Sequence, residues 1–580
     1  MSKRLLTRAS TPIALPDSLP PLVRRIYSQR AIARSEELDL TLARLLDPLS
    51  LKGMGAAVDL LEEALEGGQR LLIVADFDAD GATSCALGMT ALRAFGAAHV
   101  DYIVPNRFDY GYGLTPEIVE LAKSKNPDLL ITVDNGISSI EGVAAARAAG
   151  IKTLVTDHHL AGSHLPSADA IVNPNQPGCG FASKSIAGVG VIFYVMLALR
   201  ARLRTQGWFS RRGIAEPNLA ELLDLVALGT VADVVSLDHN NRILVSEGIR
   251  RIRAGRARPG ILSLLTLAKR NFASLAASDL GFAVGPRLNA AGRLDDMSTG
   301  IECLLTESEA EAHGLALQLD GMNRDRRDIE SGMREQAFAL VEALSLESDE
   351  LPAALSLFDE TWHQGVVGIV ASRIKERCHR PVVAFALAEV GKGDGELKGS
   401  ARSIPGFHIR DALDAVATRN PGLITKFGGH AMAAGLSLER DKLADFSAAF
   451  AEEADRVLTA EQLQASIVSD GELASHELTL TNASLLAEAG PWGQSFPEPC
   501  FHGWFRIQQT RRLGDNHLKM VLSPLDDDGL IVDAIAFGVS AEDWPAADAT
   551  EIALAYRLSV NEFRGNRSLQ LMVEHLIESR

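Results

Sequence analysis

Three features that define common classes of protein are missing from this sequence. Its five cysteines are scattered and form no Cys-x-x-Cys pair, which argues against a disulfide framework or zinc knuckle and fits a reducing compartment. The apolar stretch at 189–199 is too short to cross a bilayer. Prolines at 12, 16, 20 and 21 interrupt the N-terminus, where a secretion signal needs a continuous apolar core. We therefore expect a soluble, cytoplasmic protein.

The sequence also lacks an excess of positive charge. Its formal net charge is −18, and phosphate binding is driven largely by lysine and arginine releasing counterions, so the balance ordinarily argues against a nucleic-acid ligand. Screening weakens the objection, because the Debye length is about 8 Å at physiological ionic strength. A local basic groove can therefore bind phosphates while acids on a distant face are screened.

The length of 580 residues predicts several domains, since single cores rarely exceed about 250–300 residues. Residues 1–50 read as an N-terminal extension with one amphipathic helix at 38–46. From 71 to 237, short β-rich runs alternate with helical segments such as 82–95 and 139–149. This alternation is typical of a parallel α/β sheet.

The rest of the chain changes character twice. Apolar residues recur at helical spacing from Met322 to Leu340 among charged residues, which predicts a long connecting helix. Runs at 355–358 and 381–385 begin a second α/β unit. Short β-rich runs near the C-terminus predict a small barrel or sandwich; they lie at 518–522, 530–537, 552–560 and 568–573.

Three carboxylates, Asp76, Asp78 and Asp80, stand on alternate residues directly after the apolar run 71–74. Two like charges about 4 Å apart repel by roughly 4 kcal/mol at an effective dielectric near 20. An acidic turn in water is the commoner fate of such a segment. Bound divalent cations would instead turn the repulsion into attraction.

Other polar groups follow further strand-like runs. Asp134 follows 129–133, Asp157-His158-His159 follows 153–156, and Asp233 follows the run 228–232. The carboxyl ends of parallel strands lie on one edge of a sheet, so these groups can converge there. Oxygen-rich ligands with one or two imidazoles suit Mn²⁺ or Mg²⁺ better than structural Zn²⁺. The pattern favours a dinuclear metal site.

The motifs around these residues resemble those of the DHH phosphoesterase superfamily, in order: Asp-Phe-Asp-Ala-Asp-Gly at 76–81, Asp-Asn-Gly at 134–136, Asp-His-His at 157–159 and Gly-Thr-Val-Ala-Asp at 229–233. Three further segments resemble the RecJ family of single-strand-specific 5′→3′ DNA exonucleases, at 285–294, 362–371 and 428–435. Phe77 departs from the family, in which tyrosine is frequent at this place.

The resemblance implies an α/β multidomain fold. Its parts are an N-terminal extension (1–50), a parallel-sheet DHH domain (51–305), a connecting helix (306–345), an α/β DHHA1 domain (346–460) and a C-terminal OB-fold β-barrel that binds nucleic acid (461–580). Small-substrate members of the superfamily need no barrel, so the C-terminal region favours a polymer.

The resemblance also implies the roles of individual residues. The main ligands of two Mn²⁺ or Mg²⁺ ions are Asp78, Asp80, Asp134, His158 and Asp233, with Asp134 bridging the ions. Asp76 and His159 are expected in an outer shell of the site or against the scissile phosphate, and Asp76 is also a candidate ligand.

Substrate contacts are expected from a second set of residues. Arg107, Ser400 and Arg402 match a pocket for the 5′-phosphate, and Tyr112 is a candidate for stacking on a base. Arg287 or Arg293, beside Asn289, is expected to contact a phosphate. Gly429 and His430 belong to a loop whose amides face phosphates.

The expected activity is hydrolysis of single-stranded DNA from its 5′ end to mononucleotides, in DNA repair and recombination. Expected partners are a single-stranded DNA-binding protein and a helicase. No association with a membrane is expected. One alternative is a DHH phosphoesterase acting on oligoribonucleotides, cyclic dinucleotides or pyrophosphate. Another is a non-catalytic single-strand-binding replication factor, which predicts gaps among the ligands, and the sequence has none.

Overall fold

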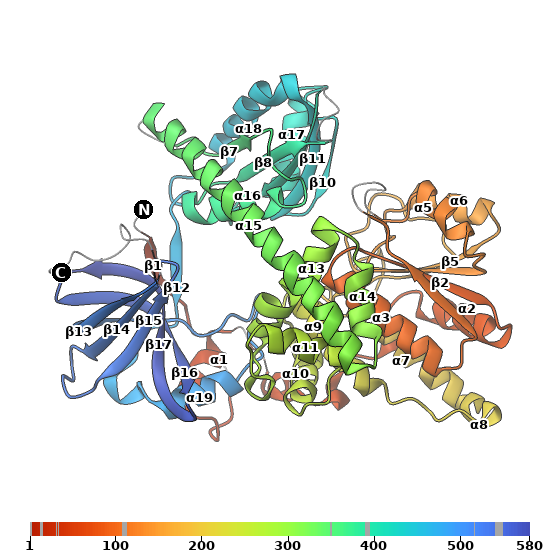
Figure 1. The fold of residues 1–580 in the computed structure, drawn as a ribbon, viewed down its shortest axis with the longest axis horizontal. Helices are drawn as coiled ribbons and strands as arrows, with labels where there is room; N and C mark the ends of the chain where they lie inside the picture. The colour runs from red at the N-terminus through yellow and green to blue at the C-terminus, as the bar shows by residue number, and fades with distance from the viewer. Residues whose placement is uncertain are drawn as a thin grey trace. The chain divides into compact units, whose positions relative to one another are not determined.

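The structure, a computed structural model, describes residues 3–11, 15–30, 32, 34–106, 113–347, 351–388, 395–514, 517–539 and 549–580. The chain divides into two compact units (Figure 1). One consists of Met1–Leu6 and Arg324–Val468, and the other of Thr7–Asn323 and Ser469–Arg580.

The larger unit contains a five-stranded parallel sheet with strand order β3-β2-β4-β5-β6. Its strands are β2 (Arg70–Ala75), β3 (His99–Ile103), β4 (Leu129–Val133), β5 (Lys152–Thr156) and β6 (Ala170–Val172). Side chains alternate between the faces of a strand, so Leu71 and Ile73 pack into one helical layer and Leu72 and Val74 into the other. The predicted parallel sheet is confirmed.

Helices cover both faces of this sheet (Figure 1). One layer contains α2 (Met54–Glu66), α3 (Ala79–Ala94) and α7 (Gly188–Thr205), and the other contains α5 (Pro116–Lys123) and α6 (Ile140–Ala148). The chain adds β3 on one side of β2 and β4 on the other, so the strand order reverses between β2 and β4. In open α/β sheets ligands bind at such a switch point, outside the carboxyl ends of the strands.

A mainly helical segment follows the sheet. It contains α8 (Trp208–Arg212), α9 (Leu223–Ala232), α10 (His239–Arg253), α11 (Pro259–Leu267), α12 (Ala277–Asp279), a π-helix η6 (Leu280–Val284), α13 (Gly285–Leu294) and α14 (Ser298–Leu305). The strand expected at 228–232 is therefore wrong, because these residues form the last turns of α9. Residues 223–230 are all buried, so no polar face marks the helical period in the sequence.

The N-terminal extension is also built differently from the prediction. Its α-helix is α1 (Pro21–Ser28), which has proline at its first position, whereas the expected helix at 38–46 is absent from these described residues. There the Asp39 carboxylate accepts hydrogen bonds from the Thr41 amide at 3.1 Å and from Arg44 at 2.9 Å. These local bonds compete with helix formation and leave two short 3₁₀ turns, Ser35–Leu38 and Leu42–Arg44.

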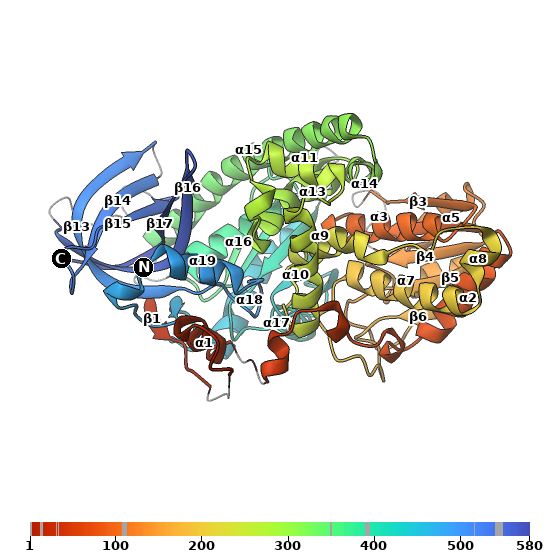
Figure 2. The ribbon, with the colours of Figure 1, turned by 90° about the horizontal axis from the view of Figure 1, so that it is seen from below.

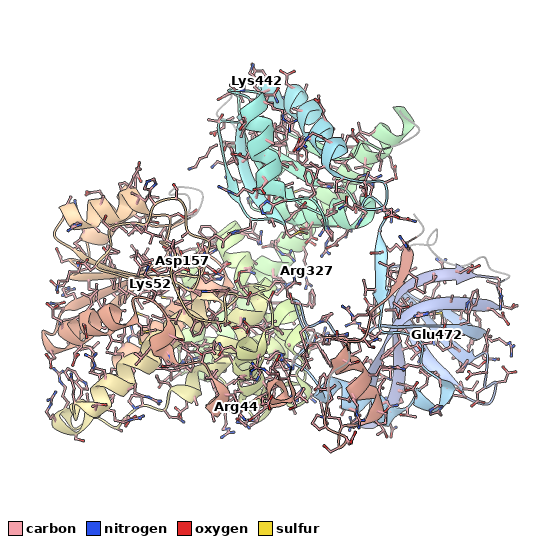
Figure 3. The ribbon with its side chains drawn as sticks, turned by 180° about the vertical axis from the view of Figure 1, so that it is seen from behind. Arg44, Lys52, Asp157, Arg327, Lys442 and Glu472 are labelled. Atoms are coloured by element: carbon pink, nitrogen blue, oxygen red, sulfur yellow. The ribbon has the colours of Figure 1, made fainter. Side chains whose placement is uncertain are left out.

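The C-terminal part of the larger unit is a five-stranded ring in which β13 pairs with both β14 and β16. Its strands are β13 (Phe501–Leu513), β14 (His517–Pro524), β15 (Val532–Phe537), β16 (Glu551–Phe563) and β17 (Asn566–Ser579), with α19 (Leu480–Glu488) packed on β16. Figure 3 marks Glu472 beside this ring, where it forms an isolated bridge to His502 of β13. The predicted barrel is thus present as this ring. Its first strand, β13, was not predicted from the sequence.

The smaller unit contains a mixed sheet with strand order β10-β11-β9-β8-β7. The strands are β7 (Leu355–Phe358), β8 (Val382–Leu387), β9 (Glu396–Arg402), β10 (Lys426–Gly429) and β11 (Ala433–Glu439), and the helices are α16 (Val367–Cys378), α17 (Ile409–Arg419) and α18 (Leu443–Val457). A short strand pair joins β1 (Arg4–Thr7) to β12 (Ser466–Ser469).

The long helix α15 (Glu309–Glu347) begins in the larger unit and ends in the smaller one. The expected connecting helix and second α/β unit are both present. Within the described part of the chain, no helix combines the length and apolarity needed to cross a membrane.

Candidate metal centre

Acidic and imidazole side chains converge at the carboxyl edge of the parallel sheet. Their ligand atoms form three overlapping groups, each with all atoms within 4.8 Å of one another: Asp134, His158 and His159; Asp80, His158 and Asp233; and Asp76, Asp78 and Asp134. Asp134 and His158 each belong to two groups, so the side chains form one continuous cluster. Because β2 and β4 precede Asp76 and Asp134, the cluster lies at the switch point of the sheet.

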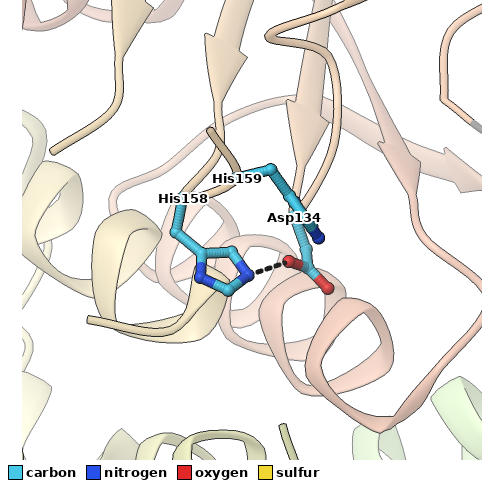
Figure 4. Close-up of side chains that lie close together, drawn as sticks. All are labelled: Asp134, His158 and His159. Atoms are coloured by element: carbon cyan, nitrogen blue, oxygen red, sulfur yellow. Dashed lines mark ion pairs between the residues drawn. The ribbon is translucent and has the colours of Figure 1, made fainter. Parts of the chain in front are cut away.

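His158 stands at the centre of this cluster. Its Nε2 lies 3.0 Å from Asp134 Oδ1, 3.5 Å from Asp233 Oδ2 and 4.0 Å from Asp80 Oδ2. Figure 4 shows the imidazole directed at the carboxylate of Asp134, with His159 beside it. One nitrogen thus faces carboxylates that come from three different elements of the fold.

Asp80 is held by the first turn of α7. Its two carboxylate oxygens accept hydrogen bonds from the Gly188 amide at 2.7 Å and the Val189 amide at 2.9 Å. A Cβ at position 188 would lie 2.7 Å from Asp134 Oδ1, so only glycine allows α7 to approach both acids. The position of Asp80 therefore depends on a close backbone approach.

The turn that carries Asp78 is fixed by hydrogen bonds on both sides. Asp78 caps α3, because its Oδ1 accepts from the amides of Asp80 at 2.9 Å and Gly81 at 3.0 Å. Asn289 of α13 accepts from the amide of Ala79 at 2.8 Å. The α13 segment thus borders the cluster and supports the Asp-rich turn.

Asp157 organises the two histidines rather than joining the cluster. Its Oδ1 accepts from the amides of His158 and His159 and lies 2.8 Å from His159 Nδ1, while its Oδ2 accepts from the Ile137 amide. Figure 3 labels this residue within the sheet domain. Asp157 therefore sets the backbone turn and the ring orientation of His159.

Burial and mutual repulsion disfavour the ionised form of three clustered acids. Burial, followed by the nearby carboxylates, raises the pKa of Asp80 to about 7 and raises the pKa of Asp134 and of Asp233 well above the usual range. Residues Asp80 and Asp134 are only 1% and 2% exposed. Such a site is under electrostatic strain until positive charge enters it.

The Asp157–His159 pair behaves in the opposite way. Burial lowers the pKa of His159, but the hydrogen bond and charge of Asp157 outweigh it and raise that pKa to about 9. Burial likewise raises the pKa of Asp157, yet the contacts with both histidines and the Ile137 amide leave it lowered. Without bound metal, the pair is therefore a carboxylate bound to an imidazolium at neutral pH.

The donor set fits hard divalent cations. Carboxylate oxygens and one or two imidazoles suit Mn²⁺ and Mg²⁺, and each group offers donors close enough to share an ion. Asp134 joins the group with Asp76 and Asp78 to the group with the histidines, which is the position of a bridging ligand.

The two arginines of α13 differ in their surroundings. Arg287 is 7% exposed and pairs with Asp320 of α15 at 2.9 Å, while its Nη1 donates to the Ala283 carbonyl. Arg287 is thus buried and ion-paired, whereas Arg293 lies half-buried at the last turn of α13. Arg107 and Tyr112 lie outside the described residues.

The remaining expected substrate residues come together within the smaller unit. In β9, the guanidinium of Arg402 donates to Ser400 Oγ at 2.9 Å. A Cβ at Gly368, in the first turn of α16, would lie 2.8 Å from both Ser400 Oγ and Arg402 Nη2. Strand β11 lies between β9 and β10 and pairs its Ala433 with Arg402. Gly429 ends β10, and His430 begins the turn from β10 to β11.

Sequence reasoning missed the amides of Gly188 and Val189, which hold Asp80. In the sequence, the segment at 189–199 stands out only as an apolar stretch. The small residues Ala187-Gly188-Val189-Gly190 before a long apolar run were the signal that a helix begins there against another backbone.

Known proteins resemble the whole chain. Three family models match it: the DHH family N-terminal domain at residues 70–230, the DHHA1 domain at 350–455 and the RecJ OB domain at 469–575. The single-stranded-DNA-specific exonuclease RecJ of Dickeya dadantii is 57% identical over 99% of both chains. The Escherichia coli protein of the same name is 55% identical over 97% of this chain and 96% of its own.

A solved structure gives the same picture. The crystal structure of RecJ from Thermus thermophilus in complex with Mn²⁺ matches with a TM-score of 0.78 at 30% identity, covering 100% of this chain and 80% of that one. The three family models, the near full-length identity and this structural match agree in order and extent. The chain belongs to the RecJ family of single-stranded-DNA-specific exonucleases.

Proposed function

We propose that this protein is a metal-dependent exonuclease that removes mononucleotides from the 5′ end of single-stranded DNA. The observation that carries the proposal is the cluster around Asp134 and His158, which is buried and rich in like charge. Relatives with up to 57% identity are single-stranded-DNA-specific exonucleases by name, and Thermus relatives have been crystallised with Mn²⁺ and with Mg²⁺. DNA repair and recombination are the expected settings.

Two divalent cations would be held by the acids and by His158. The proposed ligands are Asp76, Asp78, Asp80, Asp134, His158 and Asp233, with Asp134 shared between the ions. When bound, such a pair supplies an activated water at neutral pH and stabilises the attacking and leaving oxygens of an in-line displacement.

The chain's own residues then orient the phosphodiester. The Nδ1 of His159 lies 2.8 Å from Asp157 Oδ1, so the ring is fixed in one orientation beside the cluster. Its side chain is 29% exposed, which leaves it accessible to a substrate. We assign it a charge-assisted hydrogen bond to an oxygen of the scissile phosphate.

A polymer substrate is supported by the C-terminal ring. Arg511 and Arg512 of β13 are exposed there, as a strand-binding surface requires. A phosphoesterase for dinucleotides needs no such domain, and a purely binding protein does not need a complete ligand set.

Recognition of the 5′ end is assigned to Ser400 and Arg402. Gly368 lets the first turn of the 12-residue helix α16 approach both side chains closely. A guanidinium fork, a hydroxyl and a helix N-terminus together suit a terminal phosphate. Arg107, the amides at Gly429 and His430, and Arg293 complete the proposed substrate contacts.

The proposal includes the domain limits predicted from the sequence. It also includes two partners, a single-stranded DNA-binding protein and a helicase. A cytoplasmic location belongs to the same proposal, because the proposed DNA substrate is found there. Each of these statements rests on the family and on the proposed substrate.

Replacing Asp134 with asparagine tests the metal site without any nuclease assay. Free Mn²⁺ at a hundredfold excess over its dissociation constant stabilises a protein by about 2.7 kcal/mol. We expect Mn²⁺ to raise the thermal midpoint of the wild type by several degrees and that of Asp134→Asn far less. Without metal, the variant should be the more stable protein, because one buried like charge is gone.

Asp17→Asn is the matched control, because Asp17 is fully exposed and pairs only with Arg24 in the described structure. It should show the wild-type response to Mn²⁺. An equal Mn²⁺ shift in Asp134→Asn would show that the metal binds elsewhere.

The proposed polarity is tested with DNA labelled at one end. With Mn²⁺, a 5′-labelled single strand should release its label first as a mononucleotide, and duplex DNA should be degraded much more slowly. Asp134→Ala should lower kcat by at least on the order of 10²–10³-fold, because the ligand that holds the charge-stabilising cations is lost. Early loss of a 3′ label, or equal attack on duplex, would reject the assignment.

Arg402 tests the recognition of the 5′ end. Arg402→Ala should raise KM for 5′-phosphorylated strands by roughly 10- to 100-fold, the usual value of a charge-assisted hydrogen bond, and change KM little for 5′-hydroxyl strands. Arg402→Lys should restore only part of the preference, because it lacks the planar fork. Arg440→Ala removes an exposed guanidinium paired with Glu360 and serves as the control. Equal effects on both kinds of end would remove Arg402 from the pocket.

A further inference from the structure

Phe282 is exposed in a segment that is otherwise buried. Its side chain is 80% exposed, the largest value for a large apolar residue in the described part of the chain. In the same π-helix, Leu280 and Val284 are completely buried and Ala283 is 5% exposed. Burying a phenylalanine side chain is worth about 1.5–3 kcal/mol, so this ring forgoes a substantial stabilisation.

The π-helix that carries this ring packs on the helix that leads to the metal centre. A Cβ at Gly281 would lie 3.2 Å from Val231 Cγ1, so the segment packs on the last turn of α9, and α9 leads directly to Asp233. In the same continuous helical segment, Asn289 supports the turn between Asp78 and Asp80. Helices α9 and α13 lie next to each other in Figure 2.

A second exposed apolar residue lies next to Asp233 in the sequence. Val234, directly after Asp233, is 63% exposed and has a φ of 60°. A β-branched residue in this left-handed conformation costs on the order of 1–3 kcal/mol, which the surrounding structure must offset. Exposed apolar side chains therefore occur both at the end of α9, where Asp233 lies, and on the π-helix that packs against this end.

This combination of chemistry fits a nucleotide chain. A strand whose phosphate is held by cations at the cluster has flat apolar bases attached within a few ångströms of that phosphate. Unpaired bases have exposed faces, whereas internal bases of a duplex are already stacked on their neighbours. An exposed aromatic ring therefore contacts a single strand and gains little from a duplex. π-helical turns also occur frequently at functional sites.

We infer that Phe282 stacks on an unpaired base of the strand whose phosphate lies at the metal centre, and so contributes to the choice of single-stranded substrate. This inference rests on the proposed function and adds a binding residue to it. Phe282 binds the substrate and takes no part in the chemical step.

The test is a cycle in which the ring and the base are each removed. On a single strand of normal nucleotides, Phe282→Ala should raise KM roughly five- to 100-fold, the range measured for one aromatic–base stack, with kcat changed less than twofold. On a strand of the same length made of abasic nucleotides, wild type and Phe282→Ala should have the same KM, because no base is left to stack.

Two further variants separate stacking from apolar contact. Phe282→Trp should keep the wild-type KM on normal strands, and Phe282→Leu should behave like Phe282→Ala. Phe272→Ala is the matched control: Phe272 is 40% exposed and lies beside Gly255, just beyond the C-terminal end of the 15-residue helix α10. Equal KM for Phe282→Ala and wild type on normal strands, an equal rise on abasic strands, or full rescue by leucine would each overturn the inference.

A binding measurement keeps the inference separate from the proposed function. With Mn²⁺ present and an oligodeoxynucleotide whose phosphorothioate linkages resist hydrolysis, Phe282→Trp should lose tryptophan emission when the strand is added, and Phe272→Trp should not. If the wild type fails to degrade single strands but this quenching occurs, the proposed activity is wrong and base stacking stands. If the wild type degrades single strands and no quenching occurs, the inference alone is wrong.

Discussion

Repulsion among buried carboxylates is the constraint on which this structure depends. Asp80 and Asp134 are almost fully buried, and their ligand groups also bring Asp76, Asp78 and Asp233 into one cluster. The pKa values of Asp80, Asp134 and Asp233 are raised by burial and by one another. The fold keeps these acids together at the cost of stability, which is understandable only if divalent cations offset the charge. The affinity for metal and the instability of the metal-free cluster have the same cause.

The surrounding fold explains how such a cluster is held in place. Strand order reverses between β2 and β4, so the acids that follow these strands meet in the crevice of the sheet. Helix α7 donates two amides to Asp80, and Asp157 binds the turn that carries both histidines. The two amides of α7 fix the geometry of Asp80 without adding charge, so the buried acids still require cations.

The sequence predicted those parts of the site that follow from strand ends. Short apolar, β-branched runs located β2, β4 and β5, and the residues after them lie in the cluster or hold it. Asp233 also lies there, although the run before it is helix and not strand, because a fully buried helix has no polar face to reveal its period. The motif therefore predicted the place of Asp233 correctly, although the strand predicted before it was wrong.

Other features are set by tertiary contacts that no local pattern encodes. The approach of Gly188 to Asp134 depends on two backbones remote in sequence, and so does the pairing of Arg287 with Asp320 of α15. The exposure of Phe282 depends on a single π-turn, whose register is not readable from apolar spacing. Close approach, ion-pair choice and helix register therefore required the structure.

The central claim is that paired cations occupy the carboxylate cluster with Asp134 between them. Crystals of the protein grown with Mn²⁺ and measured at the manganese absorption edge test it most directly. The account predicts two anomalous peaks that share the Asp134 carboxylate, one of them beside His158. A single peak, or peaks bound away from Asp134, would contradict it.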